Sequence, residues 1–228
     1  DGGKRWPYYY VGLTRDEAKQ CKLAYYATIS FVDAQIGRIL DTLEENNLMD
    51  NTIIVFWSDH GYFLGEKGLW YKRKAFERSA RTPLIIAVPG TKKGQDCLKP
   101  VELIDMYPTI VDYAGYDVPQ ELEGFTLRPL LTNPQAKWDH PAITQVHHNA
   151  QQQGYSLRTE KWRYTEWNEG KAGKELYDHE NDPEEKINLA QSPKYALLTA
   201  QLSKQLQIYS KTYVAEPSKT KKKPENKK

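Results

Sequence analysis

The sequence has very little cysteine and no long apolar segment, which argues against a disulfide-rich protein and against a membrane protein. Only two of its 228 residues are cysteine, Cys21 and Cys97, and neither lies in a Cys-x-x-Cys or zinc-type spacing. A disulfide framework is therefore not expected, and the two cysteines do not indicate whether the protein belongs to an oxidising or a reducing compartment. The sequence also lacks an apolar run of about 18 residues, so we expect no membrane span. Its first residues, 1–7, contain no apolar segment of the kind found in signal peptides.

Excess charge of one sign is confined to the C-terminus. The formal net charge is +2, but residues 217–228 hold six lysines and one glutamate, which leaves residues 1–216 at −3. A basic tail with few apolar residues is typical of a solvated, disordered terminus. We therefore expect no nucleic-acid partner. The composition, 39% hydrophobic and 12% aromatic, is that of a globular protein with a sizeable core.

The first half of the chain alternates between helix and strand signals. Thr14 begins a Thr-Arg-Asp-Glu capping box, which predicts a helix start, and apolar residues at three- and four-residue spacing continue the pattern to Asn46. The short apolar runs Thr52–Trp57 and Pro83–Val88 predict buried strands. A further helix is expected over 102–114. This order predicts an α/β fold with a mostly parallel sheet flanked by helices.

The pattern changes after about residue 135. Short strand-like segments separated by glycine, asparagine and charged turns predict a small antiparallel sheet. These segments are 142–146, 154–158, 162–167 and 175–177. An amphipathic helix is expected over 193–213. The predicted organisation is an α/β portion over 1–135, a sheet-and-helix subdomain over 136–214, and a disordered Lys-rich tail over 215–228.

Polar residues directly after the first predicted strand form a candidate site, because ligands of open α/β sheets gather at the carboxyl ends of strands. Asp59 and His60 offer a carboxylate oxygen and an imidazole nitrogen to one divalent cation. Gly61 would let the backbone turn sharply beside them. The alternative is that Asp59 caps a turn and His60 is simply exposed.

The loop that follows is rich in glycine and aromatic residues, which on a loop usually line a pocket or a lid. Lys72 would place a positive charge beside a bound oxyanion. Tyr62, Trp70 and Tyr71 would form the walls of such a pocket. The alternative for Lys72 is an ordinary surface lysine, since two basic residues follow it.

Several motifs occur along the chain in a set order. They are Ser58-Asp-His-Gly61, Leu64-Gly-Glu66, Trp70 with Lys72, Val101 to Thr109, Gly154 to Thr159, Arg163-Tyr164, and Glu175 to Asp178 with Asn181-Asp-Pro183. Together they resemble the C-terminal portion of a type I sulfatase of the alkaline-phosphatase-like superfamily, and most closely its iduronate-2-sulfatase branch. The resemblance covers about residues 15–190. It implies an incomplete α/β sheet followed by a small antiparallel sheet and helix.

The resemblance implies a sulfuric ester hydrolase that removes sulfate from sulfated carbohydrates, with a location in the periplasm, outside the cell or in the lysosome. Asp59 and His60 match metal ligands, which implies a calcium or magnesium cofactor, and Lys72 matches a sulfate-binding lysine. Tyr62 matches an aromatic residue near the substrate, and Trp70 belongs to the same loop. Such a cation and lysine would stabilise the charge that develops on the sulfate oxygens.

The family's nucleophile motif does not occur in this sequence. That motif is Cys-x-Pro-x-Arg or Ser-x-Pro-x-Arg, and its cysteine or serine becomes a formylglycine; neither form is present. The first Asp-Asp metal pair of the family is missing too. We therefore expect the chain to be inactive alone, with formylglycine upstream and the missing N-terminal sulfatase portion as a candidate partner. The apolar faces of such a piece would favour association or poor solubility.

Two other interpretations stay open. A two-metal phosphodiesterase or phosphatase of the same superfamily needs further ligands. The later histidines that could supply them are His140, His147, His148 and His179. His147 and His148 could instead contact a sugar or its carboxylate, or be plain polar loop residues. The other interpretation is a non-catalytic pseudo-sulfatase binding module.

Overall fold

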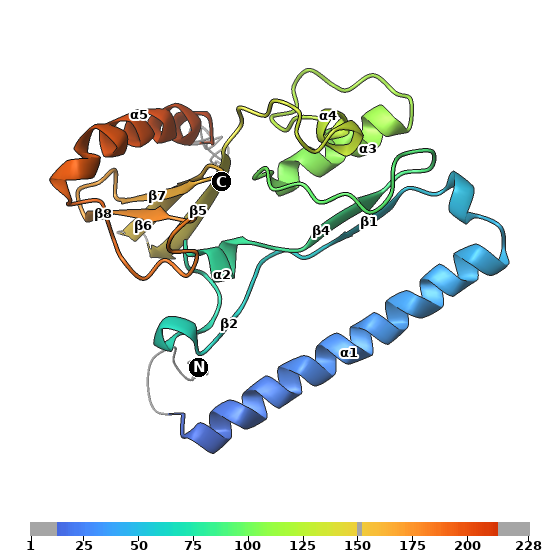
Figure 1. Cartoon of the computed structure of the whole chain (residues 1–228), viewed down its shortest axis with the longest axis horizontal. Coiled ribbons are helices and arrows are strands. Elements are labelled where there is room, and N and C mark those ends of the chain that lie inside the picture. The colour runs from blue at the N-terminus through green and yellow to red at the C-terminus, as the bar shows by residue number, and fades with distance from the viewer. Residues whose placement is uncertain (1–12, 150–151, 214–228) are drawn as a thin grey trace, which may run out of the picture.

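The computed structural model describes residues 13–149 and 152–213 (Figure 1). This part of the chain contains two small two-stranded sheets, a four-stranded sheet and five α-helices, of which the first is the longest and the last lies on one face of the four-stranded sheet. Among the described residues, no helix combines the length and the apolar composition that a membrane span requires. The division at residue 135 stays a prediction, and the predicted tail over 215–228 lies outside the described residues.

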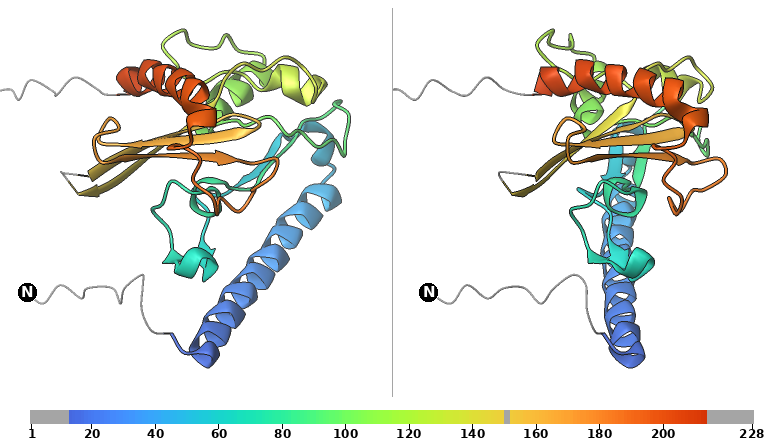
Figure 2. Two further views of the ribbon diagram at one scale, coloured as in Figure 1. Left: turned by 60° about the vertical axis from the view of Figure 1, so that its left-hand side comes forward. Right: turned by 90° about the vertical axis from the view of Figure 1, so that its left-hand side faces the viewer.

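The long helix α1 (Arg15–Glu45) begins and ends where the sequence predicts. The Glu17 carboxylate accepts from the Thr14 backbone N–H at 2.7 Å and the Thr14 hydroxyl accepts from the Glu17 N–H at 3.3 Å, so the capping box is confirmed. None of the helix residues is buried. Figure 2 shows α1 running apart from the four-stranded sheet. The prediction that this helix lies on a sheet is therefore wrong for the described residues.

The strands β1 (Ile54–Trp57) and β4 (Leu84–Ala87) pair antiparallel, with Trp57 opposite Leu84. The predicted parallel pairing is corrected here, and every strand pair in the described ranges is antiparallel. Parallel strands require a long crossover, usually a helix, and the only α-helix between β1 and β4, Glu77–Ala80, has four residues. Trp57 remains 46% exposed and Ile85 61% exposed, so these strands are not buried on both faces as predicted.

The connection from β1 to β4 contains the predicted site. A short 3-10 turn, η1 (Met49–Asn51), precedes β1. After β1 the chain forms the hairpin β2 (Phe63–Leu64) and β3 (Trp70–Tyr71) around a 3-10 turn, η2 (Glu66–Gly68), and then the four-residue helix α2 (Glu77–Ala80). Because these elements are too short to be stable alone, their positions depend on what they pack against.

The helix predicted over 102–114 is present as a 3-10 turn, η3 (Leu103–Asp105), that continues into α3 (Met106–Tyr113). The buried Asp105 carboxylate accepts from the backbone N–H groups of Glu102 and Phe125, each at 2.8 Å. These bonds tie the start of the helix to the loop before α4 (Arg128–Thr132).

The C-terminal sheet matches the prediction. Strands β5 (Ala142–Asn149), β6 (Gln152–Arg158), β7 (Trp162–Trp167) and β8 (Gly173–Asp178) form an antiparallel sheet in sequence order. A 3-10 turn, η4 (Pro193–Tyr195), leads into α5 (Ala196–Tyr213), which covers one face of this sheet (Figure 1). The core between them consists of Leu157, Tyr164, Leu176, Leu202 and Leu206. It is the best-covered apolar cluster of the described chain because a helix and a sheet face meet there.

Candidate functional site

Asp59 and His60 follow the end of β1, as predicted, and their side chains converge. The Asp59 Oδ2 atom lies 3.2 Å from His60 Nε2. The His60 Nδ1 atom lies 2.9 Å from the carbonyl oxygen of Gly61, which can only accept, so Nδ1 carries the ring proton. The Nε2 lone pair and the Asp59 carboxylate therefore lie close together.

Lys72 lies at this same place. Its Nζ atom contacts His60 Nε2, where the ammonium group donates and the ring nitrogen accepts. The structure thus brings together Asp59, His60 and Lys72, the three residues that the sequence singled out for metal and sulfate binding. The Asp59 side chain is 72% exposed, so the cluster is open to solvent on that side.

Tyr62 lies in an aromatic group beside this cluster. Its ring is 5.3 Å from that of Tyr25 on α1 and 5.6 Å from that of Tyr71, measured between centroids. Burial raises the pKa of the Tyr62 hydroxyl, and the neighbouring Tyr71 and Tyr25 add to the effect, so this phenol is a neutral hydrogen-bonding group at neutral pH. Lys72 Nζ lies 5.4 Å from the Tyr71 ring centroid.

Trp70, also predicted to line the pocket, lies at the end of the hairpin next to the turn η2. It pairs with Leu64 across the strands, and its ring lies beside Gly65, where a Cβ atom would be 3.4 Å from it. Gly65 has a φ of 112°, a conformation that favours glycine.

The structure does not join the predicted C-terminal histidines to this cluster. His147 is exposed on β5 opposite Gln153, and within the described part it has no hydrogen bond or ion pair with Asp59, His60 or Lys72. The backbone of His148 belongs to β5, but its side chain lies outside the described residues. A role for these histidines in substrate binding stays a prediction.

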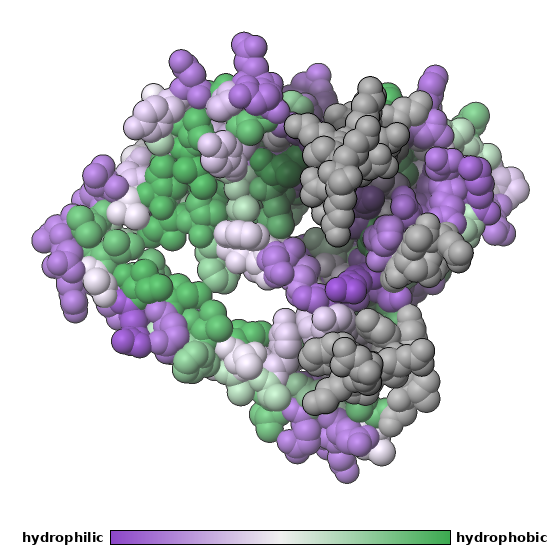
Figure 3. Space-filling view, turned by 180° about the vertical axis from the view of Figure 1, so that it is seen from behind, coloured by the Kyte–Doolittle hydropathy of each residue, from purple (hydrophilic) through white to green (hydrophobic). Residues whose placement is uncertain are grey.

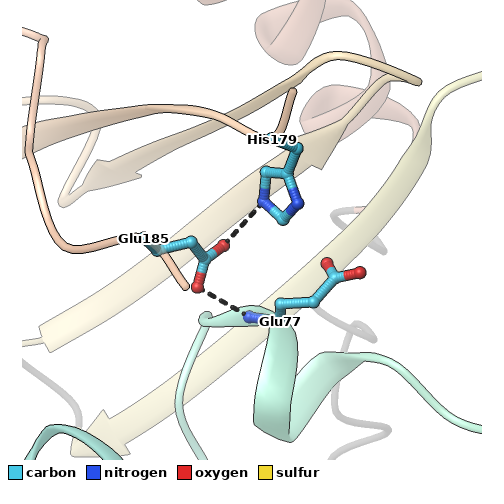
Figure 4. Close-up of side chains that lie close together, drawn as sticks. All are labelled: Glu77, His179 and Glu185. Atoms are coloured by element: carbon cyan, nitrogen blue, oxygen red, sulfur yellow. Dashed lines mark hydrogen bonds and ion pairs between the residues drawn. The ribbon is translucent and has the colours of Figure 1, made fainter. Parts of the chain in front are cut away.

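A second polar cluster was not predicted from the sequence. Potential ligand atoms of Glu77, His179 and Glu185 lie within 4.8 Å of one another (Figure 4). His179 Nε2 is 3.0 Å from Glu185 Oε1, and the Glu77 backbone N–H donates to Glu185 Oε2 at 2.9 Å. Arg163 Nε lies 2.7 Å from Glu185 Oε1, and Arg158 Nε lies 3.3 Å from Glu77 Oε2.

Arg158 and Arg163 determine whether this second cluster is a metal site or a network of ion pairs. Burial acts to raise the pKa of the Glu77 carboxyl, but Arg163 and Arg158 outweigh it, so that the pKa is lowered and the group stays ionised. Two carboxylates are thus balanced by two guanidinium groups. A cation would have to displace one of them, so we interpret the cluster as a buried ion-pair network. Arg158 and Arg163 belong to the sequence motifs quoted above, whereas no local pattern marks Glu77 or Glu185.

The Asp59–His60 pair, by contrast, suits a cation. Two electron-pair donors face one another at 3.2 Å, and the structure holds a positive group, the Lys72 ammonium, against one of them. A carboxylate oxygen and an imidazole nitrogen are both metal ligands in proteins. Two ligands are only part of the coordination shell that a divalent cation requires, so further ligands must come from other groups.

Comparison with known proteins gives the family and the fold class of this chain. A family model described as "N-sulphoglucosamine sulphohydrolase, C-terminal" matches residues 65–212, and one described as "Sulfatase" matches residues 3–116. The chain belongs to the sulfatase family, as a partial chain of the type I, alkaline-phosphatase-like class. This confirms the predicted family and α/β class; the iduronate-2-sulfatase branch is not distinguished.

Individual relatives agree with this assignment. A protein named "Sulfatase" from Formosa agariphila is 35% identical over 91% of this chain and 40% of its own length. A solved structure of a protein in complex with its substrate, D-glucosamine-2-N,6-O-disulfate, has a TM-score of 0.73 at 34% identity and covers 83% of this chain and 40% of that one. A phosphonate monoester hydrolase from Silicibacter pomeroyi has a TM-score of 0.78 at 27% identity, covering 89% and 43%. The chain thus spans about two fifths of the length of these proteins.

Proposed function

We propose that this chain is the C-terminal portion of a sulfuric ester hydrolase that acts on sulfated sugars. In the proposal Asp59 and His60 bind a divalent cation, calcium or magnesium, and Lys72 binds the sulfate group. The observation that carries it is the convergence of these three side chains after β1, with Lys72 Nζ against His60 Nε2 and Asp59 Oδ2 at 3.2 Å from the same nitrogen.

The roles follow from the chemistry of each group. The bound cation would withdraw charge from the sulfate oxygens. His60 keeps its proton on Nδ1 through the Gly61 carbonyl, so the Nε2 lone pair, which Lys72 contacts in this structure, can act as a ligand. Lys72 contacts Nε2 through a flexible four-carbon stem, so its ammonium group can turn from the ring nitrogen to a sulfate oxygen. Formylglycine, the nucleophile of the family, is expected upstream of this chain.

The substrate assignment rests on the surroundings of the cluster. The rings of Tyr62, Tyr71 and Tyr25 lie next to one another, and apolar ring faces with hydroxyl groups suit the mixed faces of a sugar. The structural relative that binds a disulfated glucosamine supports a sulfated sugar as the class. An iduronate-2-sulfate group, with Tyr62, Trp70, His147 and His148 as contacts, is the finer proposal made from the sequence.

A second candidate is hydrolysis of a phosphonate or phosphate ester. It is favoured by the similarity to the phosphonate monoester hydrolase, since a cation and a lysine can bind either kind of oxyanion. A non-catalytic pseudo-sulfatase is the third candidate, and it keeps the scaffold without turnover.

The test uses the full-length protein and compares an aryl sulfate with an aryl phosphonate ester. We expect turnover of the sulfate, and a loss of roughly 10²–10³ in kcat for Lys72→Met. Asp59→Asn should raise the calcium concentration needed for half-maximal turnover, because it removes a charged ligand. Lys171→Met and Asp139→Asn, which remove exposed charges, serve as matched controls and should be neutral.

The outcomes separate the three candidates. Turnover of the phosphonate ester alone would replace the sulfatase proposal with the second candidate, and turnover of neither substrate would favour the binding module. The purified 228-residue chain is expected to be inactive on both substrates, because the nucleophile motif is not in its sequence.

A further inference from the structure

We propose that the buried ion-pair network of Glu77, Arg158, Arg163, His179 and Glu185 positions Asp59 and His60, with α2 as the connecting element. The C-terminal sheet would thereby set the place of the proposed metal ligands although it supplies none of them. This inference rests on the proposed function in one respect only, the assignment of Asp59 and His60 as ligands.

The first step of the argument is the attachment of α2 to the C-terminal sheet. Glu77, at the start of α2, contacts Arg158 on β6 and Arg163 on β7. Its backbone N–H donates to Glu185 Oε2. Glu185 is 2% exposed and also contacts Arg163 and His179. The helix is therefore held from several directions by charge-assisted bonds, which are short and directional.

A row of apolar contacts beside this network also connects the β2–β3 hairpin, through the start of α2, to the C-terminal sheet. Phe63 of β2 is fully buried, and its ring is 6.4 Å from that of Phe76, the residue before α2. Phe76 in turn lies 6.0 Å from Tyr177 on β8. Lys67 of η2 donates to the Glu185 carbonyl oxygen and lies over the Phe76 ring. The hairpin of the site loop is thus attached to the same sheet.

The second step is the contact between α2 and the candidate ligands. The Gly61 N–H donates to the carbonyl oxygen of Ser79 at 2.9 Å. A Cβ atom on Gly61 would lie 2.2 Å from the Arg78 carbonyl oxygen and 2.7 Å from that of Arg81, so the two backbones are packed without free space. The Gly61 carbonyl holds His60 Nδ1. A displacement of α2 must therefore move the His60 ring, because close-packed backbone transmits strain.

The third step is energetic. Five ionisable side chains are brought together in a partly or fully buried position, and buried ion pairs are weak contributors to stability because desolvation offsets their attraction. A four-residue helix has no stability of its own. The main effect of the network is to fix the position of α2, because opposite charges joined by directional bonds allow few alternative arrangements.

The test is made on the full-length protein with Glu77→Gln, which removes the carboxylate but keeps the shape. We expect calcium binding, measured by isothermal titration well below the melting temperature, to weaken by roughly 10- to 100-fold, as for residues that hold metal ligands in place. Hydrogen exchange measured on the apo protein should become faster in residues 59–63. Glu169→Gln is the matched control, because Glu169 forms an exposed pair with Lys171 between β7 and β8.

Arg158→Met provides a second variant if Glu77→Gln does not fold, since it removes one arginine and leaves Arg163 on Glu77. Unchanged exchange in 59–63 together with a lower melting temperature would overturn the inference and leave the network a purely structural role. If the wild-type protein binds no calcium but exchange in 59–63 still becomes faster, the proposed metal function fails and the positioning role stands. Calcium affinity equal to wild type in both variants would also overturn the inference.

Discussion

At the scale of single residues, Glu102 is a carboxyl group whose protonation depends on the fold. Burial raises its pKa from the ordinary 4.5 to about 7, and the nearby Asp105 and Glu123 add to the rise, although the hydrogen bond from the Ile143 N–H opposes it. That bond, 2.9 Å long, joins the start of η3 to β5. Glu102 therefore links the two halves of the chain through a titrating group.

The raised pKa predicts a specific pH dependence of stability. The folded state keeps the proton up to about pH 7 and the unfolded state releases it near 4.5, so this contribution is complete below 4.5 and is lost as the pH rises through 7. Glu102→Gln keeps an acceptor for Ile143 and should flatten the decrease in unfolding free energy over this range. Urea unfolding at a series of pH values measures it.

The control for this prediction is Glu121→Gln, an exposed position nearby in the sequence, which should leave the slope as in the wild type. Equal slopes for the wild type and Glu102→Gln would show that Glu102 does not titrate in this range.

The two polar clusters show which side-chain contacts a sequence pattern can predict and which it cannot. Asp59, His60 and Lys72 could be found from the sequence because they lie at the end of one strand and on the loop that follows. Glu185 could not be found, because it meets Glu77 across 108 residues of chain. A charged residue on a polar surface and one in a buried network look alike in a sequence, since only the contacts distinguish them.

At the scale of elements, α5 and the C-terminal sheet form the best-covered unit of the described chain. Leu206 is 1% exposed and lies in the core with Tyr164 and Leu157. On the other side of the same helix, Leu197 is 84% exposed. The helix therefore carries two leucines of the same chemistry in opposite environments.

This contrast gives a prediction for helix packing. Leu206→Ala should lower the free energy of unfolding by about 2–5 kcal/mol, because it removes buried methyl groups and leaves a cavity. Leu197→Ala should change it by less than about 0.5 kcal/mol. Denaturant unfolding followed by circular dichroism measures both. A similar loss for the two variants would mean that α5 is not packed on the sheet as described.

At the scale of the whole molecule, the prominent feature is exposed apolar surface around α1 and the β1–β4 pair. On α1, Leu23, Phe31 and Ile39 are each more than 60% exposed. Figure 3 shows apolar side chains on both sides of the open space between α1 and the rest of the molecule. Contiguous apolar surface of this kind marks an interaction site or favours association.

We therefore predict that the purified 228-residue chain self-associates. Its sedimentation coefficient should rise with concentration, and replacing Phe31 and Ile39 by serine should reduce the rise because the apolar area of α1 is smaller. Lys19→Ser, on the same exposed helix, is the control and should have no effect. A single monomeric species at every concentration, with a cooperative melt, would contradict the prediction.

Interactions between neighbouring residues account for the local elements, and the order of the motifs accounts for the family. The capping box at Thr14, the β-branched run before Asp59 and the alternating strands after residue 140 predict structure through interactions between residues close in the chain, and the motif order indicates a sulfatase. Only the folded molecule shows the antiparallel pairing of β1 and β4, the exposure of α1, and the ion-pair network that joins Glu77 to Glu185. These features depend on which distant segments meet and on what covers a face, and burial and charge compensation arise only when the chain is folded.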